Sequence, residues 1–237
     1  HQRVAQMKFS YFYERALARK GEQGVRERLP QVIPKQYLEQ QSDAFYLAEI
    51  TRGIFRAGFV WRIIDAKWSG FEEAFSGFVP VYWQQVPPER LEQLADDQRI
   101  VRNWQKIETV PINARMIVEA SENHGSFGHF LAQWPSDDQV GLLQYFKRNG
   151  ARLAGATPQF FLRRIGWDGF ILSADVVTAL RNHRLLEASP TSKKGLQQAQ
   201  HWFNQWRDET GLPYSHLSRI LSLTVDARAE ERSPRKV

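Results

Sequence analysis

A short basic turn between two predicted helices is the part of the sequence best suited to bind a ligand. The first helix ends at Gly150, which is the usual left-handed C-cap residue, and Gly155 follows within the turn. Thr157 and Pro158 then predict a new helix, with Thr157 as its N-cap. Glycines let a backbone approach a phosphate closely, and a helix N-terminus offers free N–H groups and a positive dipole end. The residues expected to contact a phosphate backbone are Gly150, Arg152, Gly155, Ala156 and Thr157.

Cationic side chains lie on both sides of this turn. Lys147 and Arg148 precede it, and Arg163 and Arg164 follow it. Such side chains bind the phosphate backbone of a nucleic acid and do not read its base sequence. The same glycines also fit a plain corner between two helices, where they only allow close packing. Spacing alone leaves both interpretations open.

A carboxylate follows on the next predicted helix, residues 173–182. Ser173 is typical of an N-cap, which places Asp175 in the first turn. An acid at this position is favoured by the helix dipole in any case. Asp175 is therefore either an ordinary acid of a helix terminus or a catalytic carboxylate beside DNA.

Composition narrows the kinds of site that the chain can hold. The formal net charge of +6 favours a polyanionic partner, although only weakly. The sequence has no cysteine, which excludes disulfides, thiolate zinc sites and cysteine nucleophiles. No two of its histidines are three or four residues apart, as a helical metal pair would require. We expect no metal and no cofactor.

Helical spacing of apolar residues dominates the chain. The best candidate for a strand, residues 78–83, is short and is interrupted by Pro80. The sequence therefore predicts an all-α fold of about ten helices. No run is long enough for a membrane helix, and no apolar segment typical of a signal peptide follows the first residues. We expect a cytoplasmic protein.

The same patterns suggest a division of the chain into four parts. We expect an N-terminal helical extension at 1–40, a core at 41–190, C-terminal helices packing on the core at 191–225, and a charged, disordered tail at 226–237.

Three blocks of sequence share a pattern with one known family. The first is residues 57–61 with Ile64 and Lys67, the second runs through 100–115, and the third is the turn at 150–157. Together they resemble the DNA-3-methyladenine glycosylase I family, which belongs to the helix-hairpin-helix superfamily of DNA glycosylases. The resemblance extends over roughly residues 43–182 and implies the fold of that superfamily.

The resemblance implies excision of a damaged base that has been flipped out of the duplex. Alkylated purines carry a positive charge, which weakens their glycosidic bond. Asp175 would stabilise the developing charge on the sugar or orient water. Phe59 would fill the gap left in the duplex, and Trp61 would line the base pocket unless it is a core residue. Residues 153–162 contain no lysine, so no lyase activity is expected.

Two departures from the family pattern concern its metal and its base pocket. The best-known members of the family bind zinc through cysteines and histidines, and this chain has no cysteine. The family reads the methylated base with a glutamate, whereas Gly53 stands at the matching position here. Glu49 lies one helical turn earlier and could replace it.

The sequence therefore predicts a monofunctional DNA glycosylase of base excision repair. It would excise alkylated bases such as 3-methyladenine from damaged duplex DNA, as a monomer and without a membrane partner. One alternative is a helix-hairpin-helix DNA-binding protein without catalysis. The other is a basic α-helical domain that binds proteins. Salt-sensitive duplex binding would separate the last from the other two.

Overall fold

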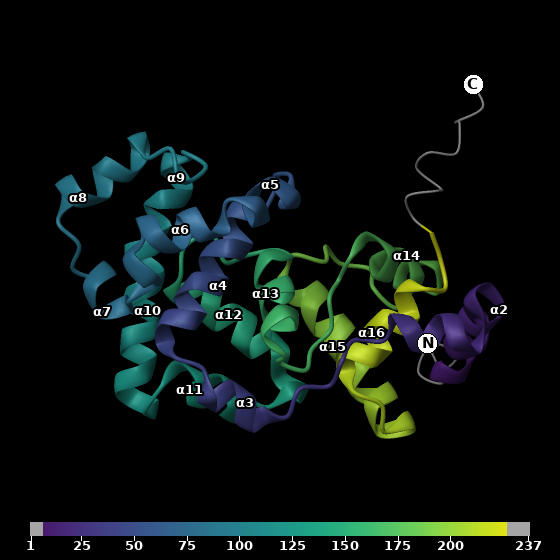
Figure 1. Cartoon of the computed structure of the whole chain (residues 1–237). Coiled ribbons are helices and arrows are strands. Elements are labelled where there is room, and N and C mark those ends of the chain that lie inside the picture. Colours follow the sequence, from purple (N-terminus) through teal and green to yellow (C-terminus); the bar gives the residue numbers. More distant parts are fainter. Residues whose placement is uncertain (1–6, 227–237) are drawn as a thin grey trace. The chain divides into compact units, whose positions relative to one another are not determined.

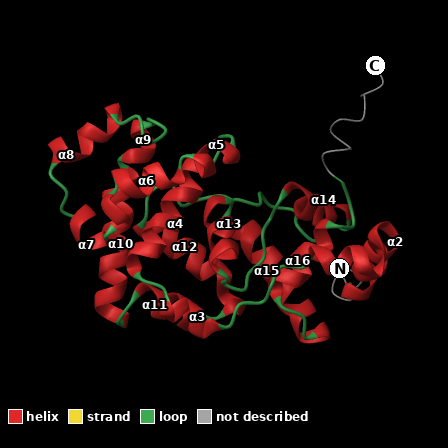
Figure 2. Ribbon diagram, in the orientation of Figure 1, coloured by secondary structure: helices red, strands yellow, loops and turns green. Residues whose placement is uncertain are grey.

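A computed structural model describes residues 7–226 of the chain (Figure 1). All secondary structure in this range is helical, as Figure 2 shows, which confirms the all-α class. The helices are more numerous than the ten or so expected. None of those between residues 7 and 226 is both long and apolar enough to cross a bilayer. The expected tail lies, apart from Asp226, outside the described residues.

The described residues form two compact units. The first consists of residues 7–33, 136–140 and 168–226, and the second of residues 34–135 and 141–167. The expected division of the chain into four successive parts stays a prediction.

The first unit is built around the C-terminal helices. Its elements are α2 (Phe9–Arg28), η3 (Ser136–Asp138), α14 (Ala174–Asn182), α15 (Lys193–Thr210) and α16 (Tyr214–Ser222). Helix α16 packs against α2, α14 and α15, and its apolar face is buried. This face is what amphipathic spacing predicts for a surface helix.

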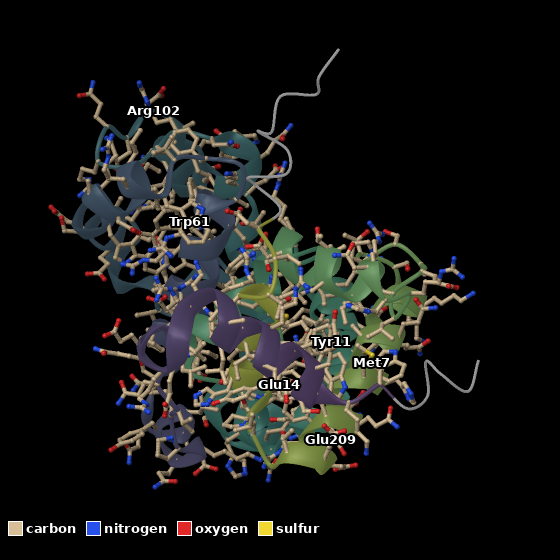
Figure 3. All side chains as sticks on the ribbon, turned by 90° about the vertical axis from the view of Figure 1, so that its right-hand side faces the viewer. Met7, Tyr11, Glu14, Trp61, Arg102 and Glu209 are labelled. Atoms are coloured by element: carbon tan, nitrogen blue, oxygen red, sulfur yellow. The ribbon has the colours of Figure 1, made fainter. Side chains whose placement is uncertain are left out.

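Aromatic side chains join α2 to α15 within this unit. Phe9 and Phe12 are both buried, and their ring centroids lie 5.5 and 5.3 Å from that of Trp206. The Trp206 indole donates to the carbonyl of Met7, and the Phe9 N–H donates to Glu209. Met7 and Glu209 are labelled in Figure 3. These contacts order the start of α2.

Asp168 fixes the start of α16. Its two carboxylate oxygens accept from the backbone N–H groups of Tyr214 at 3.1 Å and Ser215 at 2.9 Å. A carboxylate at a helix N-terminus satisfies donors that have no partner within the helix.

The second unit contains the remaining helices. Its elements are α3 (Lys35–Gln40), α4 (Asp43–Arg56), α5 (Trp61–Ala66), α6 (Trp68–Ala74), η1 (Ser76–Phe78), α7 (Pro80–Trp83), α8 (Pro88–Gln93), η2 (Leu94–Asp96), α9 (Trp104–Ile107), α10 (Thr109–His124), α11 (Phe127–Gln133), α12 (Gln139–Asn149, in this unit from Gly141) and α13 (Thr157–Ile165).

Helix α4 is the centre of the second unit. The Ser42 hydroxyl accepts from the Phe45 N–H, so it caps the helix as its residue type predicts. Helix α4 packs against α10, α11 and α13, and Leu47, Ile50 and Ile54 are buried there. One end of α4 is thereby held close to the start of α13.

The apolar spacing of residues 104–123 predicts one long helix, but the structure divides this stretch in two. Helix α9 ends at Ile107, and α10 begins at Thr109. Pro111 lies in the first turn of α10, where its missing N–H costs no helical hydrogen bond. The proline therefore stands at the start of a helix and does not kink its middle.

Candidate nucleic-acid interface

The turn between α12 and α13, residues 150–156, is held by a buried amide. Asn113 of α10 is fully buried; its Nδ2 donates to the Ala151 carbonyl at 3.2 Å, and its Oδ1 accepts from the Ala151 N–H at 2.8 Å. A Cβ on Gly150 would lie 2.9 Å from Asn113 Oδ1 and 2.9 Å from the Phe146 carbonyl oxygen. Gly150 is needed for this close packing. Its φ is not positive, so the expected left-handed C-cap is wrong.

Positive φ angles occur later in the turn, at Arg152 (54°) and Gly155 (65°). The Arg152 side chain is exposed, and its Nη2 donates to the Gln105 amide oxygen at 2.7 Å. Within the described part of the chain, no carboxylate forms an ion pair with Arg152. Its charge therefore stays available to an external anion.

The start of α13 differs from the expected cap. Ala156 is the N-cap and Thr157 is the first helical residue, with Pro158 second. Ala156 has no side-chain oxygen, and the Thr157 N–H has no acceptor within residues 7–226. Both the free donor and the helix dipole favour an anion or another acceptor at this point.

A pocket of about 260 Å³ opens beside this helix start, within the second unit. It lies between the C-terminal part of α4, the beginning of α5 and the first turns of α13. The lining residues are Gly53, Arg56, Ala57, Gly58, Trp61, Ala156, Thr157, Phe160 and Arg164.

Two aromatic rings and a guanidinium form one side of the pocket. The ring centroids of Trp61 and Phe160 are 5.6 Å apart, with their planes at 85°. The Arg56 guanidinium lies over the Trp61 ring, 4.9 Å from its centroid. Trp61 is 45% exposed and lines the pocket, so it is not a core residue in this structure. Figure 3 labels this side chain.

The loop between α4 and α5 carries apolar side chains that face solvent. Phe59 is 42% exposed and Val60 is 53% exposed. Lys106 lies beneath the loop and is nearly buried; its ammonium donates to the carbonyls of Phe55 at 3.1 Å and Ala57 at 2.8 Å. Burial lowers the pKa of Lys106, and the positive charge of Arg152 lowers it further. Phe59 is thus exposed on an anchored loop, and its role as a DNA wedge stays a prediction.

Residues 39–150, a little under half of the chain, match the model of the methyladenine glycosylase family. The matched region contains α4, the exposed loop and the amide clamp of Asn113.

Several solved structures are similar to this chain. One is the 3-methyladenine DNA glycosylase I of Staphylococcus aureus, with 22% sequence identity and a TM-score of 0.48, covering 59% of this chain and 80% of that one. Another is a structure of 3-methyladenine DNA glycosylase I with 21% identity and a TM-score of 0.47, covering 59% of this chain and 82% of that one.

Gly53 and Glu49, the two positions considered for reading a methylated base, differ in whether they line the pocket. Gly53 lines the pocket, whereas Glu49 is not among the lining residues. Arg164 Nε donates to Glu49 Oε2 at 2.7 Å, and Arg164 Nη2 donates to the Glu49 carbonyl at 2.6 Å. A Cβ on Gly53 would lie 3.2 Å from Arg164 Nη2. The guanidinium of Arg164 therefore lies opposite Gly53.

Three lining side chains were not assigned to the pocket from the sequence, namely Arg56, Phe160 and Arg164. Their spacing in the sequence could have indicated that each arginine shares a helix face with another lining residue. Arg56 follows Gly53 by three residues on α4, and Arg164 follows Phe160 by four residues on α13, so each pair shares a helix face. What the sequence does not reveal is that the two faces meet.

Asp175 lies in the first unit, in the first turn of α14. The Ser173 hydroxyl accepts from the Val176 N–H, which confirms Ser173 as the N-cap. Asp175 is half-buried. The turn at 150–156 and the pocket belong wholly to the second unit. A shared cleft for Asp175, Trp61 and Glu49 stays a prediction.

Proposed function

We propose that this chain is a monofunctional DNA glycosylase that binds damaged duplex DNA, flips one nucleotide out and hydrolyses its N-glycosidic bond. One observation carries the proposal: Ala156 and Thr157 belong both to the basic turn and to the lining of an aromatic-walled pocket. A phosphate bound at the turn would therefore lie next to a space that has room for one flat heterocycle. The match of residues 39–150 to the model of the methyladenine glycosylase family supports it.

Each part of the second unit has a role in this reaction. The backbone of the turn and Arg152 hold phosphates, as a helix-hairpin-helix would. Phe59 occupies the gap in the base stack, and Trp61 with Phe160 holds the flipped base. These side chains are exposed or line the pocket, so they can reach DNA without unfolding.

The bond-breaking step needs a carboxylate and one water molecule. Asp175 stabilises positive charge on the sugar as the bond between C1′ and the base nitrogen breaks, and the bonding electrons leave with the base. The water oxygen then bonds to C1′, and its proton is passed on through Asp175. The products are a free base and an abasic site. Without a lysine in residues 153–162, the strand is not cleaved.

The proposal is tested by incubating the chain with duplexes that carry single damaged bases. Released base is identified by mass spectrometry, and abasic sites are counted by alkaline strand cleavage. Release from at least one damaged duplex, with none from undamaged DNA, is expected. Salt-sensitive duplex binding without release of any base would indicate a DNA-binding module instead. Absence of salt-sensitive binding would leave the protein-binding alternative.

Arg152→Ala is expected to weaken duplex binding about fivefold, because it removes one phosphate contact. The slope of log affinity against log salt should fall by about one. Fluorescence anisotropy at several salt concentrations measures both. The loss should be equal for duplexes of unrelated sequence, and a loss confined to one sequence would contradict a phosphate contact.

Phe59→Ala is expected to slow excision about tenfold and to leave thermal stability almost unchanged, because the side chain is 42% exposed. Single-turnover excision and a thermal melt are the measurements. Val81→Ala is a matched control, because Val81 is an exposed apolar residue of α7 outside the pocket. If both variants slow excision equally, the proposed wedge role of Phe59 is contradicted.

A further inference from the structure

The ionisable side chains that line the pocket are all cationic. Arg56 and Arg164 line it, and no carboxylate does. An alkylated purine of the kind implied by the resemblance carries a positive charge, and two guanidiniums repel such a ligand. The chemistry of this pocket therefore differs from that of a pocket built to hold a cation.

Each of the two guanidiniums has an uncommitted donor. Arg164 uses Nε and Nη2 on Glu49, and Arg56 uses Nε and Nη2 on Asp65 Oδ1 at 3.0 and 2.6 Å. The Nη1 atoms of both arginines have no acceptor among residues 7–226. The Thr157 N–H and hydroxyl are uncommitted in the same range. The pocket thus offers donors from three residues.

The carboxylates around the pocket only partly compensate this charge. Glu49 and Asp65 lie outside the lining and form ion pairs with Arg164 and Arg56. Arg52, on the same helix, adds a third positive charge 3.9 Å from Glu49. Burial lowers the pKa of Arg164, and the charges of Arg56 and Arg52 lower it further, which reflects the crowding of like charges. The N-terminus of α13 contributes positive potential as well.

We propose that the pocket binds a neutral base whose ring carbonyl oxygens accept hydrogen bonds from Arg56 and Arg164, and that it excludes cationic alkylated bases. This inference rests on the proposed glycosylase function and changes the class of base expected from the sequence. Deaminated bases such as hypoxanthine and uracil have this chemistry: they are flat, uncharged and rich in carbonyl oxygens.

The walls of the pocket favour a base over a simple phosphate. Trp61 and Phe160 present ring surfaces, and Ala57 with Gly53 adds apolar and backbone surface. A phosphate gains nothing from ring faces, whereas a flipped base stacks on them. Arginine donors directed at a carbonyl then distinguish an oxo base from adenine, which offers an amino group at the same ring position.

Two duplexes test the inference, one with a single deoxyinosine and one with a single N1-methyldeoxyadenosine. The first base is neutral with a carbonyl oxygen, and the second is a cation at neutral pH. Base release is measured on both duplexes, and binding of the free nucleosides inosine and N1-methyladenosine is measured by calorimetry. We expect at least tenfold tighter binding of inosine and faster release from the deoxyinosine duplex.

Substitutions at Gly53 add a negative charge to the pocket, with a neutral side chain of the same size as a matched control. Gly53→Glu places a carboxylate next to Arg164, and Gly53→Gln places an amide of the same size there. Gly53→Glu should reduce the preference for inosine over N1-methyladenosine at least tenfold. Gly53→Gln should weaken the binding of both nucleosides by the same factor. Circular dichroism melts establish that both variants fold.

Arginine substitutions provide a second, independent pair. Arg56→Gln removes a lining charge, and Arg52→Gln removes an equal charge whose guanidinium lies over Trp68, 4.5 Å from its ring centroid and outside the lining. Arg56→Gln should weaken inosine binding about tenfold, and Arg52→Gln less than twofold. Equal effects of the two would overturn the proposed contact.

The possible results separate this inference from the proposed function. Release of the cationic base in preference to hypoxanthine would overturn the inference and leave the glycosylase function intact. Preference for inosine in calorimetry without release from either duplex would support the inference and contradict catalysis. Failure to bind inosine at millimolar concentration would overturn the inference.

Discussion

Asp175→Asn should slow base excision at least about 100-fold while duplex affinity stays within about twofold of wild type. The change removes one negative charge and keeps the shape of the side chain. If Asp175 stabilises the charged sugar, its loss acts on the transition state and not on the bound duplex. Single-turnover excision with saturating enzyme measures the first quantity, and fluorescence anisotropy measures the second.

Asp168→Asn is a matched control for this change. Asp168 lies in the same unit, and its two carboxylate oxygens accept from the Tyr214 and Ser215 N–H groups. An amide offers only one acceptor oxygen, so this variant should lose about 1–2 kcal/mol of stability. Its excision rate below the melting temperature should stay near that of wild type. Loss of duplex binding in Asp175→Asn would instead indicate a structural acid at the start of α14.

The helix starts of the fold could be predicted where a side chain supplies the cap. Ser42, Ser173 and Ser192 each accept a backbone N–H three residues later, as their residue type predicts. These contacts are local, so neighbouring residues determine them. The all-α class follows similarly from apolar spacing.

Thr157 and Gly150 show where local reasoning failed. Thr157 is a favoured cap residue, yet the helix starts one residue earlier, after Ala156. Gly150 was expected to have a left-handed backbone conformation, but its φ is not positive. A glycine is needed there because Asn113, 37 residues earlier in the sequence, packs against it. The conformation at Gly150 depends on how Asn113 of α10 holds the turn, and that contact is not encoded in the residues of the turn itself.

The candidate site was predictable in part for the same reason. Trp61 and Gly53 were assigned to a base pocket by resemblance, and both line the pocket beside α13, whose binding of a base stays a prediction. Arg164 was only one of several cations near the turn. Its hydrogen bond to Glu49 spans 115 residues of sequence, and nothing in either helix alone indicates it. The charge of the pocket therefore became visible only in three dimensions.

Arg164→Met should destabilise the fold by about 3 kcal/mol, the largest loss of stability expected from any single change discussed. The side chains of Glu49 and Arg164 are only 13% and 19% exposed, so removing the guanidinium leaves a buried carboxylate without its main partner. Breaking a buried ion pair from one side typically costs about 3–5 kcal/mol. Arg52 remains 3.9 Å from Glu49 and recovers part of this loss, which favours the lower end of the range.

The double variant Glu49→Gln with Arg164→Met separates two contributions to the free energy of unfolding. One is the cost of leaving a buried carboxylate unpaired, and the other is the net contribution of the ion pair. Replacing both charges removes the desolvation penalty together with the attraction, so the double variant should be at least about 1 kcal/mol more stable than Arg164→Met alone. Urea unfolding of the four proteins in the cycle measures this. A double variant as unstable as Arg164→Met would mean that the guanidinium is needed for packing against α4, whatever the charge of Glu49. A rescued fold that no longer prefers inosine would show that the Arg164 guanidinium itself is needed for this preference.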